Sequence, residues 1–127
     1  MNHEEIIQQA LLANGDVEGH AFHGNQHVAA GEYHASKAEE HAASARQAAK
    51  AGDRKQASFH ASQASAHALH AESHVAASGN HKQAIEAATR AHAAAANANK
   101  AAGTVGAHVH HADMASYHSS MAKLLSR

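Results

Sequence analysis

The sequence predicts an all-α protein: an antiparallel four-helix bundle with alanine and histidine heptad seams, preceded by a short N-terminal helix and an ordered glycine-rich loop. The chain has 127 residues, the size of one domain, and it contains no proline and much alanine, the residue that favours helix most. Glycine recurs at nearly even intervals, at Gly52, Gly79 and Gly103, as expected at helix ends. Between these glycines, histidine and alanine repeat every seven residues, which is the period of packed helices.

The N-terminal region combines a short helix with a loop. Asn2 and Glu5 have the spacing of a capping box, and an apolar stripe follows them until Gly15 interrupts it. A short docking helix is therefore expected, followed by an ordered loop. This interpretation divides the chain into residues 1–26, with the docking helix and loop, and residues 27–127, with the helical bundle.

Four long helices are predicted in the second part. Asp53 with Gln56 and Asn80 with Gln83 both have capping-box spacing, so new helices are expected to start directly after the first two glycines. Connections this short place successive helices side by side and antiparallel, although an extended stack of helical hairpins is the alternative. The predicted helices span residues 28–51, 54–78, 81–102 and 105–126.

Histidine is the most unusual feature of the composition, with 16 residues. Placing histidine at heptad position d puts alanine at position a, so that helices can approach closely while imidazoles fill the remaining space. Because a buried polar group must be paired, each buried neutral histidine is expected to hydrogen bond to Ser, Glu, Gln or His across the interface. Burial of neutral imidazole also predicts that stability falls below a pH of about 6.5. The heptad series comprises His20, His27, His34, His41, His60, His67, His74, His81, His111 and His118.

Metal binding is the competing interpretation of the histidines. His67, His70 and His74 lie on one face of a predicted helix, and imidazoles four residues apart can share one ion. A heptad, however, distributes its imidazoles along a seam, and the His-Glu-x-x-His order of zinc proteases is missing. The sequence therefore predicts no cofactor, and these three histidines are the alternative metal ligands.

Composition and motifs disfavour several classes of function. Ten Lys and Arg residues against eleven Asp and Glu residues give a net charge of −1, which disfavours nucleic-acid binding at neutral pH. The chain has no cysteine and no apolar run long enough to cross a bilayer, and its first residues lack the basic start of a signal peptide. No nucleophile with an oriented base and no phosphate-binding loop is recognisable in the sequence. The expectation is a non-enzymatic cytoplasmic protein without catalytic residues and without a membrane partner.

Residues 19–26 carry the most distinctive short motif in the chain. Six of them match the pattern Gly-His-x-Phe-x-Gly-Asn-Gln, namely Gly19, His20, Phe22, Gly24, Asn25 and Gln26. This motif resembles a signature of that form in small and large proteins of tailed bacteriophages, including portal-associated and head-morphogenesis proteins. Ala21 stands where members of that family often have proline.

The resemblance implies an origin in a phage or prophage and a non-enzymatic role. One hypothesis is a structural or accessory protein that binds capsid or another virion protein through its N-terminal region, in the virion or in the cytoplasm of the infected bacterium. A second is a small host-takeover inhibitor that binds a bacterial protein. A His-rich bundle that responds to metal or to protons is the third.

The motif itself has two interpretations. It can form a recognition element for a protein partner, because glycines allow close approach and Phe22 offers an aromatic anchor. Alternatively, it can form a packed cap over one end of the bundle, with Phe22 in the core and Asn25 and Gln26 capping the first long helix.

Self-association or docking onto a larger assembly is also expected. Large apolar side chains are scarce, so that a monomer buries little apolar surface and is only marginally stable. The last predicted helix carries an apolar stripe that we expect to receive the N-terminal helix. This stripe consists of Met114, Tyr117, Met121, Leu124 and Leu125.

Overall fold

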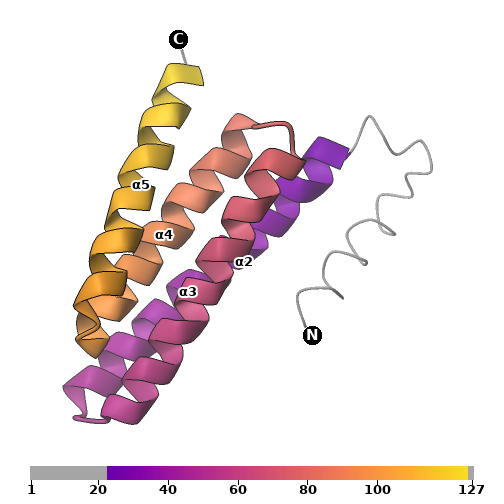
Figure 1. Cartoon of the computed structure of the whole chain (residues 1–127). Helices are drawn as coiled ribbons and strands as arrows, with labels where there is room; N and C mark the ends of the chain where they lie inside the picture. Colours follow the sequence, from indigo (N-terminus) through magenta and orange to yellow (C-terminus); the bar gives the residue numbers. More distant parts are fainter. Residues whose placement is uncertain (1–22, 126–127) are drawn as a thin grey trace.

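The computed structural model describes residues 23–125, which form helices and no strand (Figure 1). The helices are α2 (His23–Lys50), α3 (Arg54–Ala77), α4 (Lys82–Ala102) and α5 (Val105–Leu125). The predicted all-α class is confirmed, and the helices pack on one another as in a bundle. The predicted N-terminal helix, and the loop up to residue 22, lie outside the described residues. None of the helices between residues 23 and 125 combines the length and the hydropathy that a bilayer span requires.

The core lies between α2, α3 and α4, which pack against one another in all three combinations. A continuous cluster of buried alanines from these helices, including Ala38, Ala64 and Ala91, fills the centre, and each of these three side chains is fully buried. Because a methyl group is small, alanine allows helix axes to come close together. This close approach brings the longer imidazole side chains of facing helices within hydrogen-bonding distance.

The helix α4 is central, because it packs against each of the other three helices. Its alanines are buried on several sides, including Ala87, Ala91 and Ala94. The helix α5 packs along α4, on the outside of the three-helix core (Figure 1). A smaller apolar cluster closes the end of the molecule where α5 meets the core, and it consists of Val28, Val75, Ala84, Ile85, Ala88 and Ala122.

The turns follow the predicted glycines, with one difference in capping. Asp53 caps α3, and its side chain accepts a hydrogen bond from the backbone N–H of Gln56, as predicted. The cap of α4 is His81 rather than Asn80, and the Nδ1 atom of His81 accepts from the N–H of Gln83. The reason is that Asn80 has a left-handed φ of 60° and belongs to the chain reversal, so the helix starts one residue later.

The helix α2 begins at His23, so it includes the last four residues of the predicted loop. Asn25 and Gln26 therefore lie inside the first turn of α2 and do not cap it. Gln26 is 3% exposed and Val28 is also buried, whereas Asn25 is exposed, so this first turn already has a core side and a solvent side. The prediction of a loop up to residue 26 was wrong, because α2 and its buried side extend one turn further toward the N-terminus.

The apolar stripe predicted on the last helix is mostly exposed, although Met121 packs against the smaller apolar cluster. Tyr117, Leu124 and Leu125 are each about half exposed, and Met114 and Met121 are half-buried. Val105 and Val109 add to the exposed apolar surface of α5. The expected contact of this stripe with the N-terminal helix lies outside the described residues and stays a prediction.

Candidate functional site

Three pairs of histidines join α2 to α3. In each pair the two Nδ1 atoms are hydrogen bonded, at 2.9 Å for His27 and His74, 2.8 Å for His34 and His67, and 2.9 Å for His41 and His60. Residue numbers rise by seven along α2 and fall by seven along α3 from one pair to the next. We call these six residues the histidine ladder. The expectation that histidines pair across a helix interface is confirmed.

The rings of successive pairs also stack on one another. The rings of His34 and His74 lie 5.9 Å apart and are nearly parallel, at 13°, and those of His41 and His67 lie 5.7 Å apart at 14°. Hydrogen bonds and stacking contacts therefore alternate along the ladder. This arrangement makes one continuous column of six imidazoles between two helices.

An Nδ1–Nδ1 hydrogen bond limits how many protons a pair can carry. One nitrogen must donate and the other must accept, so one of the two imidazoles has to keep an unprotonated Nδ1 atom. A fully protonated pair would place two donors and two positive charges against each other. Burial, and then the nearby charge of His60, lowers the pKa of His41 in agreement with this limit.

A fourth histidine pair extends the same chemistry to α4 and α5. The Nδ1 atoms of His92 and His111 are 2.9 Å apart, and both side chains are buried. Burial, together with the neighbouring His92 and His110, lowers the pKa of His111 to about 4. His111 is therefore neutral at physiological pH.

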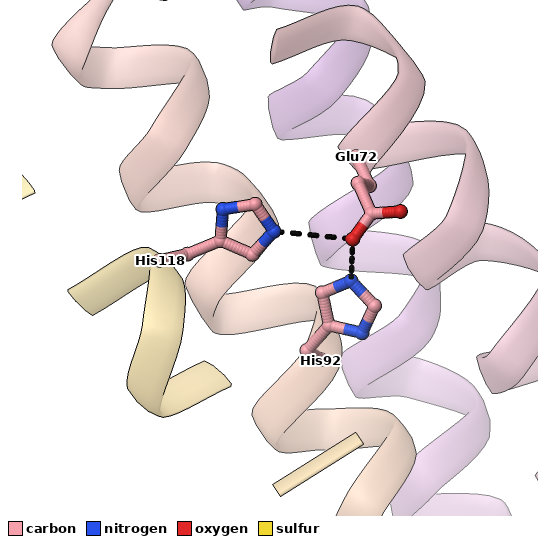
Figure 2. A group of neighbouring side chains, drawn as sticks. All are labelled: Glu72, His92 and His118. Carbon is pink, nitrogen blue, oxygen red and sulfur yellow. Dashed lines mark hydrogen bonds and ion pairs between the residues drawn. The ribbon is translucent and has the colours of Figure 1, made fainter. Parts of the chain in front are cut away.

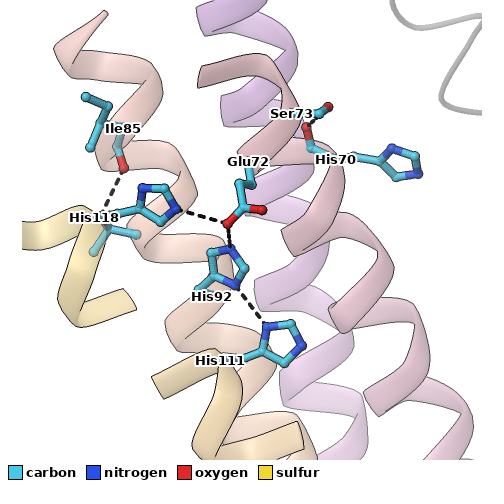
Figure 3. Close-up of polar contacts among 8 residues, drawn as sticks. His70, Glu72, Ser73, Ile85, His92, His111 and His118 are labelled. Atoms are coloured by element: carbon cyan, nitrogen blue, oxygen red, sulfur yellow. Dashed lines mark hydrogen bonds and ion pairs between the residues drawn. The ribbon is translucent and has the colours of Figure 1, made fainter. Parts of the chain in front are cut away.

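Glu72 of α3 connects this pair to a further histidine (Figure 2). Its Oε1 atom lies 3.1 Å from Nε2 of His92 on α4 and 3.1 Å from Nε2 of His118 on α5. The side chain of His92 is fully buried and that of His118 is 7% exposed, whereas Glu72 is one-third exposed. The rings of the two histidines are stacked, 5.5 Å apart. Figure 3 shows His92 between Glu72 and His111, so that four side chains form one connected group.

The charges in this group are set by burial and by mutual contact. Partial burial by itself raises the pKa of the Glu72 carboxyl, but the hydrogen bonds and charges of His118 and His92 outweigh it and hold that pKa below its ordinary value. Burial lowers the pKa of His92, although Glu72 acts in the opposite direction. At neutral pH the group consequently presents a carboxylate beside neutral His92.

Comparison with known proteins identifies no relative: no protein-family model, curated protein or solved structure matches this chain. The functional interpretation therefore depends on the residues themselves.

The residues of the phage-like motif are only partly described. Gly19, His20 and Phe22 lie outside the described residues, and Gly24 lies in the first turn of α2. Asn25 is exposed on that turn and Gln26 is buried. Among the described motif residues, Asn25 is thus accessible to a partner, and Gln26 contributes to the core.

The three histidines proposed as metal ligands on α3 do not converge on one point. His67 bonds to His34 and His74 bonds to His27, while the ring of His70 lies 5.0 Å from that of His34. Within residues 23–125, the set of His and acidic side chains with ligand atoms close enough to share an ion is Glu72, His92 and His118.

Sequence reasoning missed the connected group of Glu72, His92, His111 and His118, although two signals point to parts of it. His92 and His111 are separated by 19 residues across the turn at Gly103, the same separation as His41 and His60 across the turn at Gly52. Glu72 is the one acidic residue in α3.

Proposed function

We propose that this protein is a non-enzymatic structural or accessory protein of a tailed bacteriophage, an antiparallel four-helix bundle that binds capsid or another virion protein through its N-terminal region. Support comes from the motif at residues 19–26 and from the way apolar side chains are distributed. The motif gives the phage context, and the distribution indicates a protein that binds other proteins.

The single observation that carries this proposal is the exposure of large apolar residues over an alanine and histidine interior. The central cluster consists of alanine, whereas seven large apolar side chains are exposed on the surface. A large exposed apolar surface is typical of protein–protein contact. The exposed residues are Phe59, Leu69, Val105, Val109, Tyr117, Leu124 and Leu125, of which five belong to α5.

The end of the motif is accessible in the described part of the chain. Asn25 is exposed in the first turn of α2, directly beside buried Gln26. An exposed amide can donate and accept hydrogen bonds with a partner backbone. The motif thus joins a recognition residue to a residue that fixes it on the bundle.

Mass spectrometry of purified phage particles tests the virion assignment, and we expect the protein in stoichiometric amounts. A Phe22→Ala, Asn25→Ala double variant should retain the thermal midpoint of the parent while losing capture of the virion partner. Asn97→Ala changes another exposed amide, on α4, and is the matched control. Absence from particles, with capture of a host protein instead, would favour the host-takeover inhibitor and contradict the virion role.

A second function, response to protons, is favoured by the histidine ladder. In its central pair, His34 is fully buried and bonds to His67. In the next pair along the ladder, His41 and His60 are both partly buried and bond to each other. On the same helix as His41, the charge of Glu40 raises the pKa of His41 and the charge of Lys37 lowers it. Because a doubly protonated pair has no acceptor, acid is expected to loosen α2 from α3 before the whole bundle unfolds.

Hydrogen exchange at pH 7.5 and 5.5, corrected for the intrinsic rates, tests this second function. In the parent we expect protection of α2 and α3 to fall more than that of α4 at pH 5.5. Replacing one pair by amides, with His41→Gln and His60→Gln, should reduce this difference because amides do not titrate. Equal protection at both pH values in a folded parent protein would rule out a proton response of the ladder.

A further inference from the structure

We propose that Glu72, His92 and His118 form a binding site for a divalent transition-metal ion of the zinc class (Figure 2). The ligands would be two imidazole Nε2 atoms and one carboxylate oxygen. Each ligand comes from a different helix: Glu72 from α3, His92 from α4 and His118 from α5.

The distances match the size of a tetrahedral site. Both Nε2 atoms lie 3.1 Å from Oε1 of Glu72, and all three ligand atoms lie within 4.8 Å of one another. In tetrahedral zinc sites the metal–ligand bonds are about 2.0–2.1 Å, which places neighbouring ligand atoms about 3.3 Å apart. Small movements of the side chains would therefore be sufficient to admit an ion.

The ligand types select the class of metal. Two imidazoles with one carboxylate suit zinc and neighbouring transition metals such as cobalt and nickel, whereas magnesium and calcium prefer oxygen ligands alone. The low pKa of His92 and the low pKa of Glu72 keep the first neutral and the second ionised at neutral pH, and these are the forms that bind metal.

His111 supplies the second layer of the site. Without metal, Nε2–H of neutral His92 donates to Glu72, and Nδ1 of His92 accepts from His111. With metal on Nε2, the proton of His92 resides on Nδ1 and donates to Nδ1 of His111. The same 2.9 Å contact serves both states because its direction can reverse, and a hydrogen-bond acceptor for the second ring N–H is usual for a metal-binding histidine.

A surface hollow of about 170 Å³ gives access to the site, with Glu72 and His118 in its lining. Three protein ligands leave the fourth position of a tetrahedral ion to water or to another donor. Apolar Val75 and Ile85 form part of the same lining. The ion can enter from the partly exposed side, at Glu72, while His92 remains covered.

Metal binding would fix α5 to the core. Among the other helices, α5 packs chiefly on α4, and the group around Glu72 links it to α3. An ion shared by α3, α4 and α5 would strengthen this link. The ladder differs in this respect, because its Nδ1–Nδ1 hydrogen bonds already join imidazoles in pairs between α2 and α3.

Titration of the tag-free, metal-stripped full chain with Co²⁺ and Zn²⁺ tests the site. We expect one saturable equivalent with a low-micromolar or tighter dissociation constant, the visible spectrum of four-coordinate Co²⁺, and a rise in the thermal midpoint. Glu72→Gln and His118→Gln should each weaken binding at least tenfold. His110→Gln removes an exposed imidazole from the same helix as His118 and should leave binding unchanged.

Equal affinity and stoichiometry in the parent, Glu72→Gln and His118→Gln would show that other histidines hold the ion and would overturn the proposal. If the substituted proteins do not fold, X-ray absorption of the zinc-loaded parent decides the question. Two imidazoles with oxygen donors support the site, and a shell of imidazoles alone or of oxygen alone contradicts it. These measurements do not depend on a phage partner, so their failure would leave the virion proposal intact.

Discussion

Acidification from pH 7.5 to 5, in the presence of a chelator, lowers the midpoint of thermal unfolding by at least about 8 °C. The cause is a set of histidines that are neutral when folded. The pKa of His111 is about 4 in the folded protein against an ordinary value of 6.5, and the pKa values of His41 and His92 are also lowered.

The sign follows from the proton balance between the two states. Above pH 6.5 both states leave these histidines neutral, so pH has little effect on stability. Below pH 6.5 His111 becomes protonated in the unfolded chain, whereas in the folded protein it stays neutral until the pH approaches 4. In this pH range, each pH unit lowers the free energy of unfolding by about 1.4 kcal/mol for each histidine that is protonated only in the unfolded chain. His111 alone therefore lowers it by about 2 kcal/mol at pH 5.

Two neighbouring histidines provide a matched test of this explanation. His111 is buried, whereas His110 is exposed beside it on α5. Thermal melts of His111→Gln should show a weaker dependence on pH than the parent, because the unfolded chain loses one proton acceptor. Melts of His110→Gln should change much less than those of His111→Gln, because burial is a larger cause of the lowered pKa of His111 than the charge of His110. Equal midpoints at pH 7.5 and 5 in the parent would mean that folded histidines take up protons as freely as unfolded ones.

The periodic part of this architecture was predictable from the sequence. Heptad spacing of histidine and alanine fixes which residues face a neighbouring helix, and the glycine turns fix which residues lie opposite each other. His41 and His60, for example, lie on opposite sides of the turn at Gly52 and are separated by 19 residues, and their contact follows from the heptad positions on the two helices that this turn joins. The all-α class and the pairing of histidines depend only on such local periodicity.

The Glu72 group was not predictable in the same way. Its contacts require that α3, α4 and α5 each turn one particular face toward the other two. The placement of α5 outside the core is a result of packing that no local pattern specifies. The N-terminal boundary of α2 was missed for a related reason. Burial of Gln26 in the core favours one more helical turn, although glycine and asparagine beside it are typical of a loop.

Ala64→Leu is expected to destabilise the bundle by about 1–3 kcal/mol, with a fall of roughly 5–20 °C in the thermal midpoint. Ala64 is fully buried in the alanine cluster shared by α2, α3 and α4. A leucine there has no space unless the helices move apart. Intrinsic helix propensity is not the cause, because leucine is nearly as favourable in a helix as alanine.

Ala66→Leu is the matched control, because Ala66 is exposed on the same helix two residues away. We expect its midpoint to stay within about 2 °C of the parent, since surface substitutions usually change stability by less than about 0.5 kcal/mol. A similar midpoint for Ala64→Leu would mean that the alanine seam is loosely packed.

The two predictions are coupled through His41, whose pairing with His60 depends on the distance between α2 and α3. The 2.8 Å bond between His34 and His67 exists because alanines such as Ala64 let these helices come close. Separation of the helices by a leucine would lengthen that bond and admit water to the imidazoles, so that protonation of the ladder becomes easier. Ala64→Leu should therefore unfold at lower temperature at pH 7.5 and also lose less stability than the parent between pH 7.5 and 5. If the first effect occurs without the second, close helix packing does not control the protonation of the ladder.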